Sequence, residues 1–284
     1  APMSIAVGYA FCCLFFAALN DFVFKLFARK ERSRGLFVAV AGSVWFALLA
    51  FLPWSPESDF GATLLWGAVS GALSVTSNLL LIEAMSHNSA GMCATIFRLN
   101  LVLVVLSAAL LLDETLTLLQ WCGVLLAALA VLAFLPAGGD AKKLRNAGLI
   151  LVLAAAALRS GMGIAYKYGF TQGADRNGII LINSIFWIVC GGFYALFREK
   201  AAFRPERKVL RYGLLSGFLL AGIVVFMALS LEQGSASVVL PVAQMSFLGT
   251  FLLSALLLKE KLSLCKAAAL LSGSAAIILL TVGG

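Results

Sequence analysis

The chain has 284 residues, of which 62% are hydrophobic and only 12% are charged, and its mean hydropathy is +1.02. Soluble domains are roughly 45–50% apolar and about 25% charged, so this composition excludes an ordinary soluble protein. The net charge of +8 does not indicate nucleic-acid binding, because the basic residues gather in short connections between apolar runs.

These apolar runs are long enough to cross a membrane. A helix needs about 20 mostly apolar residues to span roughly 30 Å of hydrocarbon. Ten such runs lie near residues 4–28, 35–52, 61–84, 90–112, 117–136, 147–170, 177–197, 210–231, 236–258 and 263–282. The sequence therefore predicts an all-α polytopic membrane protein with ten transmembrane helices.

The first run carries polar residues on one side. Asn20, Asp21, Phe24 and Lys25 recur there at helical spacing. Asp21 and Lys25 are separated by one helical turn, a spacing that usually indicates a structural ion pair. Asp21 is nevertheless the best candidate for a carboxylate that titrates inside the membrane.

The third and fourth runs add Asn78 and, in the middle third of the fourth, Arg98. A charge at mid-membrane costs about 2.5–3.5 kcal/mol on insertion scales, so it normally faces a partner or water. Two interpretations stay open. Arg98 pairs permanently with Asp21 and fixes the helices, or it serves as the counter-ion of a bound molecule.

The sixth run carries a second arginine. Arg159 lies midway along it and shares one stripe with Gly163, Tyr166 and Lys167. Tyr166 either contacts a ligand or anchors the helix at the interface. Lys167, like Lys25, is expected to extend its amine towards the membrane surface.

The later runs hold fewer polar residues. Asn183 and Trp187 in the seventh run are candidate cavity residues of weak specificity. In the ninth run Pro241 removes a backbone donor, and Gln244 follows one turn later. A helix with these features suits the lining of a cavity.

The chain also repeats internally. "AALLLDETLTL" (108–118) and "SALLLKEKLSL" (254–264) align without gaps at a shift of 146 residues, and a weaker shift of 142 pairs Trp45 with Trp187. The sequence therefore predicts two five-helix halves, residues 1–138 and 139–284. Because five is odd, the second half is expected to be inverted relative to the first.

The repeat relates several polar residues. The shift of 146 pairs Arg98 with Gln244, and an axis in the membrane plane brings two such mid-depth residues together. It also pairs Glu114 with Glu260. Both precede the fifth helix of their half, where a carboxylate stabilises the helix N-terminus.

The basic residues predict the topology. Sixteen of the 21 Lys and Arg lie in the connections after the first, fifth, seventh and ninth runs, against Arg176 alone on the other side. Positive loops remain cytoplasmic, so both termini are expected outside a bacterial-type inner membrane. The basic loops are expected to touch anionic membrane lipid.

No metal site or cofactor is expected. All six cysteines fall inside apolar runs without CxxC or Cys/His spacing, and His87 is the sole histidine. Metal sites built from Cys and His need several such residues at short spacing.

The segment "LEQGSASVVLPVAQMSFLGTFLLSALLLKEKLS" (231–263), together with the ten runs in two halves, resembles the ten-helix EamA-like branch of the drug/metabolite transporter superfamily. The resemblance implies a secondary transporter whose spans 1, 3, 4, 6, 8 and 9 surround a cavity. Members of the family are usually described with cytoplasmic termini, which differs from the orientation that the charge bias predicts here.

We therefore expect a transporter for a small anionic or zwitterionic metabolite, amino-acid or carboxylate-like, because two guanidinium groups exceed one carboxylate. The expected substrate-binding residues are Arg98, Arg159, Gln244, Asn20, Tyr166, Asn78 and Trp187. Asp21 is expected to couple transport to a proton or cation, or to pair with Arg98 when the site is empty. Since one chain holds both halves, a monomer is sufficient, and a homodimer is also compatible.

Other functions fit less well. A carrier of cationic drugs or quaternary amines would rely on Asp21 and an aromatic cage, and a flippase on this fold would place a lipid headgroup at the arginines. Nucleotide-sugar exchange fits an anion site, although no motif for a base is visible. An enzyme would need a nucleophile with its base or clustered carboxylates, and a channel usually shows a ring of like polar residues.

Overall fold

A computed structural model of the chain describes residues 2–28, 32–87, 93, 96–133, 146–200, 206–258 and 264–282. Every regular element within these ranges is helical, as the sequence predicted. The helices are α1 (Pro2–Ala28), α2 (Arg34–Leu49), α3 (Phe60–His87), α5 (Asn100–Leu111), α6 (Leu118–Ala133), α7 (Asn146–Thr171), α8 (Arg176–Phe193) with a π-helical extension (Tyr194–Arg198), α9 (Arg207–Gln233), α10 (Ala236–Gln244), α11 (Ser246–Leu258) and α12 (Leu264–Val282).

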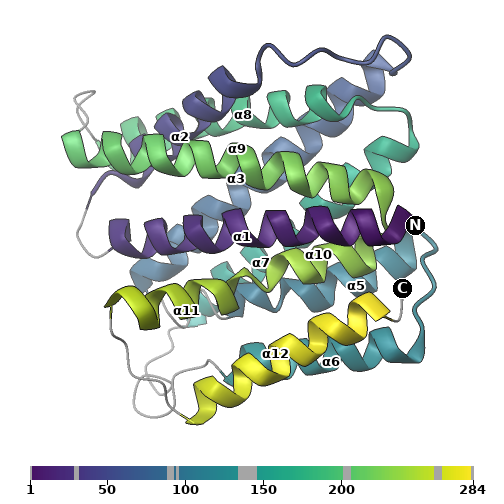
Figure 1. Ribbon diagram of the computed structural model, residues 1–284. Helices are drawn as coiled ribbons and strands as arrows, with labels where there is room; N and C mark the ends of the chain where they lie inside the picture. Colours follow the sequence, from purple (N-terminus) through teal and green to yellow (C-terminus); the bar gives the residue numbers. More distant parts are fainter. Residues whose placement is uncertain are drawn as a thin grey trace.

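The helices run side by side, and both chain ends lie at the same end of the bundle (Figure 1). We call this the terminal end and the opposite one the basic end. At the basic end, Glu199 accepts hydrogen bonds from Ser33 Oγ and from the backbone N–H groups of Arg34 and Gly35. Arg198 and Arg34 lie there too, so the described basic connections are at the end opposite the termini, as expected.

Four helix pairs form the frame of the bundle. The most extensive contacts join α1 with α9, α3 with α7, α6 with α12 and α2 with α8. In addition, α3 packs on α8 and α2 packs on α9. Helix α10 is buried along its whole length. It contacts α5 and α1, while α5 also contacts α7 and α1 also contacts α11.

Glycines allow a close approach between α2 and α8 with its π-helical extension. A Cβ at Gly35 would lie 2.5 Å from the backbone nitrogen of Ala195, and one at Gly191 would lie 2.8 Å from that of Ala39. Real Cβ atoms do not approach backbone atoms so closely, so any larger residue would force the two helices apart.

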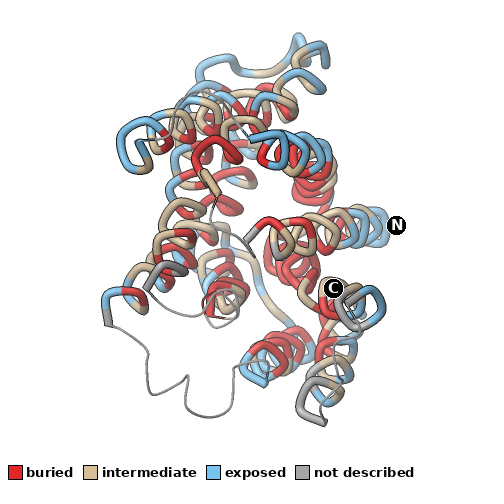
Figure 2. Tube along the Cα trace, turned by 90° about the vertical axis from the view of Figure 1, so that its left-hand side faces the viewer, coloured by how far each residue is buried: buried red, intermediate tan, exposed pale blue. Residues whose placement is uncertain are grey.

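The outer surface is apolar, as a lipid solvent requires. Large hydrophobic side chains such as Leu110, Leu125, Leu256 and Leu271 are exposed on the outside, while buried segments face inward (Figure 2). Six described helices are long and apolar enough to cross a membrane, and four shorter apolar helices accompany them. The protein is therefore an integral membrane protein.

Two helical segments are interrupted at positions that lie 146 residues apart in the sequence. In the fourth predicted span, Leu99 donates its N–H to Ile96 O at 3.0 Å and accepts from Val102 at 3.1 Å. In the ninth, Met245 breaks the helix between α10 and α11 and makes the corresponding bonds to Val242 and from Leu248, at 3.1 and 3.0 Å. Pro241 is not the cause, because the fourth span has the same break with threonine at the corresponding position, residue 95.

Some predicted features lie outside the described residues. These are Glu260, the basic residues at 29–30, 142–145, 204 and 259–261, and the side chains of Lys25, His87 and Lys266.

Candidate functional site

Arg98 lies at the centre of the bundle, beside the break in its helix. Its Nη2 forms an ion pair with Asp21 Oδ2, and its Nη1 donates to Gln244 Oε1 at 3.0 Å. Ser246 Oγ donates to the same Asp21 oxygen at 3.0 Å. The sequence had placed Arg98, Asp21 and Gln244 near one another, and the structure brings the three together.

Asp21 therefore has three stabilising neighbours. Besides Arg98 and Ser246 Oγ, its carboxylate lies at the first residue of α11, whose N-terminal end carries a partial positive charge. The Arg98 and Asp21 side chains are 16% and 30% exposed. A pair so largely removed from water keeps more of its Coulomb attraction than a surface pair.

Arg159 has a different environment. It lies within electrostatic range of Arg98, Asp21, Cys13 and Tyr166. Within the described part of the chain it forms no ion pair, and its one hydrogen bond, to Met162 Sδ at 3.5 Å, is long and weak. A guanidinium presents five N–H donors, so most of its binding capacity is unused.

Tyr166 is fully buried and supports the contact between α7 and α8. Its hydroxyl donates to Asn183 Oδ1 at 3.2 Å. Asn183 Nδ2 in turn lies 2.8 Å from Ser70 Oγ and 3.1 Å from Gly67 O, both on α3. This network connects three helices around the hydroxyl of Tyr166.

Trp187 of α8 and Asn78 of α3 both form a hydrogen bond with Ser74 of α3. The indole Nε1 of Trp187 donates to Ser74 Oγ at 3.0 Å, and Asn78 Nδ2 donates to Ser74 O at 2.9 Å. The Trp187 ring packs edge-on against Trp45, with ring centroids 5.9 Å apart. Both side chains thus make contacts within the protein.

Asn20, next to Asp21, faces α9. Its Oδ1 accepts a hydrogen bond from Ser216 Oγ at 2.6 Å. Its amide N–H groups have no hydrogen bond to the described residues, so they are available to a ligand.

Sequence reasoning missed Asn100, the first residue of α5. Its side chain is fully buried, yet neither amide atom has a hydrogen-bond partner among the described residues. Burying an unpaired amide costs about 1–3 kcal/mol. The signal that could have found it is the repeat, because a shift of 146 pairs Asn100 with Ser246.

Glu114 lies at the terminal end of the bundle and binds the N-terminal end of α10. Its carboxylate accepts hydrogen bonds from the N–H groups of Ala236 and Ser237, both at 2.8 Å, and from Ser237 Oγ at 2.6 Å. The expectation that it stabilises the helix after it is wrong. Thr117 and Gln120 cap that helix, α6, reciprocally, and Glu114 instead caps α10.

Lys167 binds the segment that connects α9 to α10 from the side of α9. Its Nζ donates to the carbonyl oxygens of Leu231 and Gly234, both at 2.7 Å, at the C-terminal end of α9. The expectation that this amine extends to the membrane surface is therefore wrong. The unpaired carbonyls of a helix end offer a cation a nearer partner.

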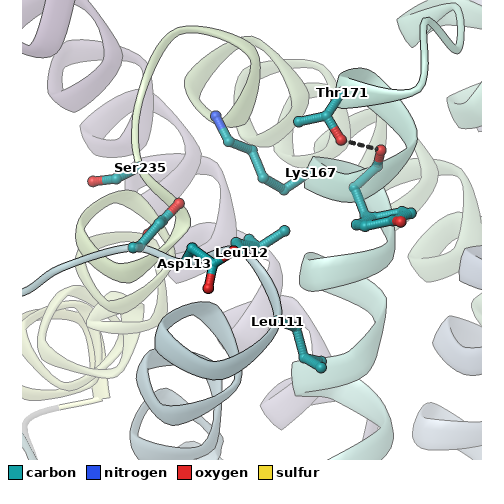
Figure 3. A pocket seen from close by; sticks show the side chains of 8 residues that line it. Leu111, Leu112, Asp113, Lys167, Thr171 and Ser235 are labelled. Carbon is teal, nitrogen blue, oxygen red and sulfur yellow. Dashed lines mark hydrogen bonds between the residues drawn. The ribbon is translucent and has the colours of Figure 1, made fainter.

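A cavity of about 460 Å³ lies beside these contacts. In Figure 3 the Lys167 amine points towards the connection that carries Ser235. The lining residues are Leu111, Leu112, Asp113, Glu114, Lys167, Tyr168, Thr171 and Ser235. The cavity is open to the outside and forms a vestibule at the terminal end.

Comparisons with known proteins agree with this architecture. Residues 4–135 match the family described as the EamA-like transporter family. One solved structure, titled only "Crystal structure of protein", is similar over 98% of this chain and 97% of its own, with 16% sequence identity and a TM-score of 0.76. At that identity the likeness shows the fold alone. No curated protein matches the chain significantly.

Proposed function

Because residues 4–135 match the EamA-like transporter family, we propose that the chain is a secondary transporter that moves a small anionic or zwitterionic metabolite across the cytoplasmic membrane. The observation that carries this proposal is Arg159. It is a guanidinium at the centre of a membrane protein without a carboxylate partner among the described residues.

A charge placed at mid-membrane needs a counter-charge or water. Arg98 satisfies this requirement with Asp21 and Gln244, whereas Arg159 does not satisfy it within the described protein. A carboxylate or similar acid group on the substrate would supply the missing partner, since a planar guanidinium binds such a group through two parallel hydrogen bonds.

In this proposal the other expected binding residues differ in how directly they would contact the substrate. Gln244 and Asn20 offer polar contacts near the Arg98–Asp21 pair. Tyr166 adjoins Arg159, while Asn78 and Trp187 act through the packing of α3. Asp21 is the group that would exchange partners or take up a proton during transport.

The internal repeat of the sequence, interpreted as two inverted halves, supports alternating access around this site. A Cβ at Gly67 would lie 2.7 Å from Ile182, and one at Gly213 would lie 2.7 Å from Val40. The shift of 146 pairs the two glycines, and the shift of 142 pairs the two residues that they face. The same relation exchanges the pair α1–α9 with α7–α3, and α2–α9 with α8–α3.

The helix breaks agree with this symmetry. The bonds at Leu99 and Met245 correspond one to one at a shift of 146. In transporters built from inverted repeats, substrate sites lie near the midplane beside such discontinuous helices. Arg98 and Gln244 each precede a break by one residue. The group formed by Arg98, Asp21 and Arg159, which we call the polar centre, therefore lies where substrate would bind.

The cleanest test is counterflow in proteoliposomes with amino acids, carboxylates, phosphate esters and quaternary amines, comparing wild type with Arg159→Gln and Arg159→Lys. We expect anion or zwitterion exchange that Arg159→Gln abolishes and Arg159→Lys retains in part, because lysine keeps the charge but not the fork.

Arg176→Gln is the matched control, since Arg176 pairs with Glu232 at the terminal end, away from the polar centre, and exchange should persist in that variant. Exchange of cations alone, or unchanged anion exchange in folded Arg159→Gln, contradicts the proposal.

A further inference from the structure

The polar centre holds an unbalanced set of charges. Arg98 and Arg159 contribute two guanidinium groups, and Asp21 contributes one carboxylate within electrostatic range of both. Lys167 does not enter this balance, because two carbonyl oxygens bind its amine at the terminal end. Among the described side chains, the centre therefore carries one net positive charge.

This excess matters because buried apolar residues surround the partly exposed charges. The residues about the centre, among them Met245, Met162 and Cys13, are buried. In such surroundings a surplus charge of either sign is penalised far more strongly than in water. A ligand that brings the total charge to zero is therefore favoured over one that leaves a surplus.

Resting on the transport function proposed above, we propose that the substrate carries a single net negative charge, and that Asp21 sets this valence by cancelling one of the two guanidinium charges. A monocarboxylate at Arg159 neutralises the centre while Arg98 keeps its ion pair with Asp21 and its hydrogen bond to Gln244.

Ligands of two other classes would leave the centre with a net charge. A dianion leaves one negative charge uncompensated. A zwitterion leaves the original positive charge, and an ammonium group that engages Asp21 takes the carboxylate away from Arg98 and from Ser246 Oγ. The proposal thus narrows the anionic and zwitterionic class to monovalent acids.

The test compares three series of probes with three to six carbons at neutral pH: monocarboxylates, amino acids and dicarboxylates. Binding is measured as ligand-induced thermal stabilisation of the purified full chain in detergent, and exchange is measured by counterflow. Wild type is expected to prefer monocarboxylates.

Asp21→Asn is expected to shift the preference towards dicarboxylates by about tenfold or more in relative affinity, an energy of about 1.4 kcal/mol. The amide oxygen of this variant still accepts from Ser246 Oγ and Arg98. The double variant Asp21→Asn/Arg98→Gln restores one net positive charge and should restore the monocarboxylate preference. Arg176→Gln, at the terminal end where Arg176 pairs with Glu232, should leave the preference unchanged.

A second variant keeps the test decisive if Asp21→Asn does not fold. Gln244→Glu has nearly the same shape, retains an acceptor for Arg98 and removes the net charge of the centre. It should lose the preference for monocarboxylates over amino acids.

The outcomes separate the two proposals. If wild type binds no acid of any series, the transport function proposed above fails as well. If acids bind through Arg159 but the charge variants do not change the preferred valence, the anion site stands and Asp21 does not set the valence.

Discussion

At the scale of single residues, Arg98 and Arg159 differ in the groups that would lose a partner if they were removed. Arg98 is the partner of Asp21 and Gln244, whereas Arg159 has only its long contact with Met162 Sδ. The energetic role of an ion pair depends on the partner that remains after truncation. The same substitution should therefore act on stability at one site and on ligand binding at the other.

We predict that Arg98→Gln lowers stability by about 1–3 kcal/mol, less than the roughly 3–5 kcal/mol for fully buried pairs, because both side chains are partly exposed. Arg159→Gln should lower it little or raise it. Thermal unfolding in detergent compares the two variants. A greater loss in Arg159→Gln would show that Arg159 has a structural partner and would remove the main argument for an anion site.

The hydroxyl of Tyr166 offers a second test at this scale. Tyr166→Phe removes the 3.2 Å hydrogen bond to Asn183 but keeps the buried ring, so a loss of about 0.5–1.5 kcal/mol is expected. Transport by the folded variant should persist, because Asn183 retains its contacts with α3. Complete loss of transport with unchanged stability would assign the hydroxyl to the substrate instead.

Sequence patterns predicted some of these residues and missed others for physical reasons. Arg98, Asp21 and Gln244 were found because charge or amide groups inside apolar runs are rare. Ser246 was missed because small hydroxyl residues are common in membrane helices. Asn100 is an amide inside an apolar run, and only the repeat, which pairs it with Ser246, gives it significance. Lys167 was misjudged because the carbonyls that bind it belong to α9, more than sixty positions away.

At the scale of elements, the terminal end is held by side chains that cap helices to which they do not belong. Glu114 caps α10 and Lys167 caps the end of α9. The connection between α9 and α10 is thereby fixed from both sides beside the vestibule. Any motion that opens the centre towards the terminal end has to release these contacts.

Glu114→Ala should lower stability by about 1–2 kcal/mol, as expected for loss of a helix N-cap. Glu57→Ala is the control, since Glu57 is an exposed acid of the same end and should change stability by less than about 0.5 kcal/mol. Thermal unfolding measures both, and equal effects would show that the contact with α10 contributes nothing.

Two adjacent glycines of α8, Gly191 and Gly192, provide a direct test of the contact between α2 and α8. Gly191→Ala places a Cβ 2.8 Å from the backbone of Ala39, whereas Gly192→Ala meets nothing within 4 Å. Overpacking should cost about 1–3 kcal/mol in the first variant, while the second should be neutral or gain up to about 1 kcal/mol of helix propensity. Tolerance of alanine at residue 191 would contradict the close approach of the two helices.

At the scale of the whole molecule, the apolar runs predicted membrane-spanning helices because length and hydropathy are properties of local sequence. The interruptions at Leu99 and Met245 were not predicted, since both lie inside continuous apolar runs without a local signal. The two ends are distinguished by basic residues at helix ends: Arg34 begins α2, Arg198 ends the π-helical extension of α8 and Arg207 begins α9. The starts of α2 and α9 lie opposite the chain termini (Figure 1).

The orientation in the membrane follows from this distribution of charge. Positive residues are retained in the cytoplasm, so we predict that both termini face outward. A C-terminal alkaline phosphatase fusion should be active, and a green fluorescent protein fusion should be dark. The reverse pattern would place the basic end outside, in the orientation usual for the family that the chain resembles.

The paired helix breaks have a mechanical consequence. The helices that follow the two breaks, α5 and α11, begin at the depth of the polar centre and contain 12 and 13 residues. At 1.5 Å per residue such a helix is about 18–20 Å long, so a tilt of about 10° at its joint displaces its tip by roughly 3 Å. The joint itself hardly moves. A small rotation at either break can therefore widen one opening of the bundle by about the diameter of a water molecule. The charged groups of the polar centre lie at the joint and keep their mutual distances.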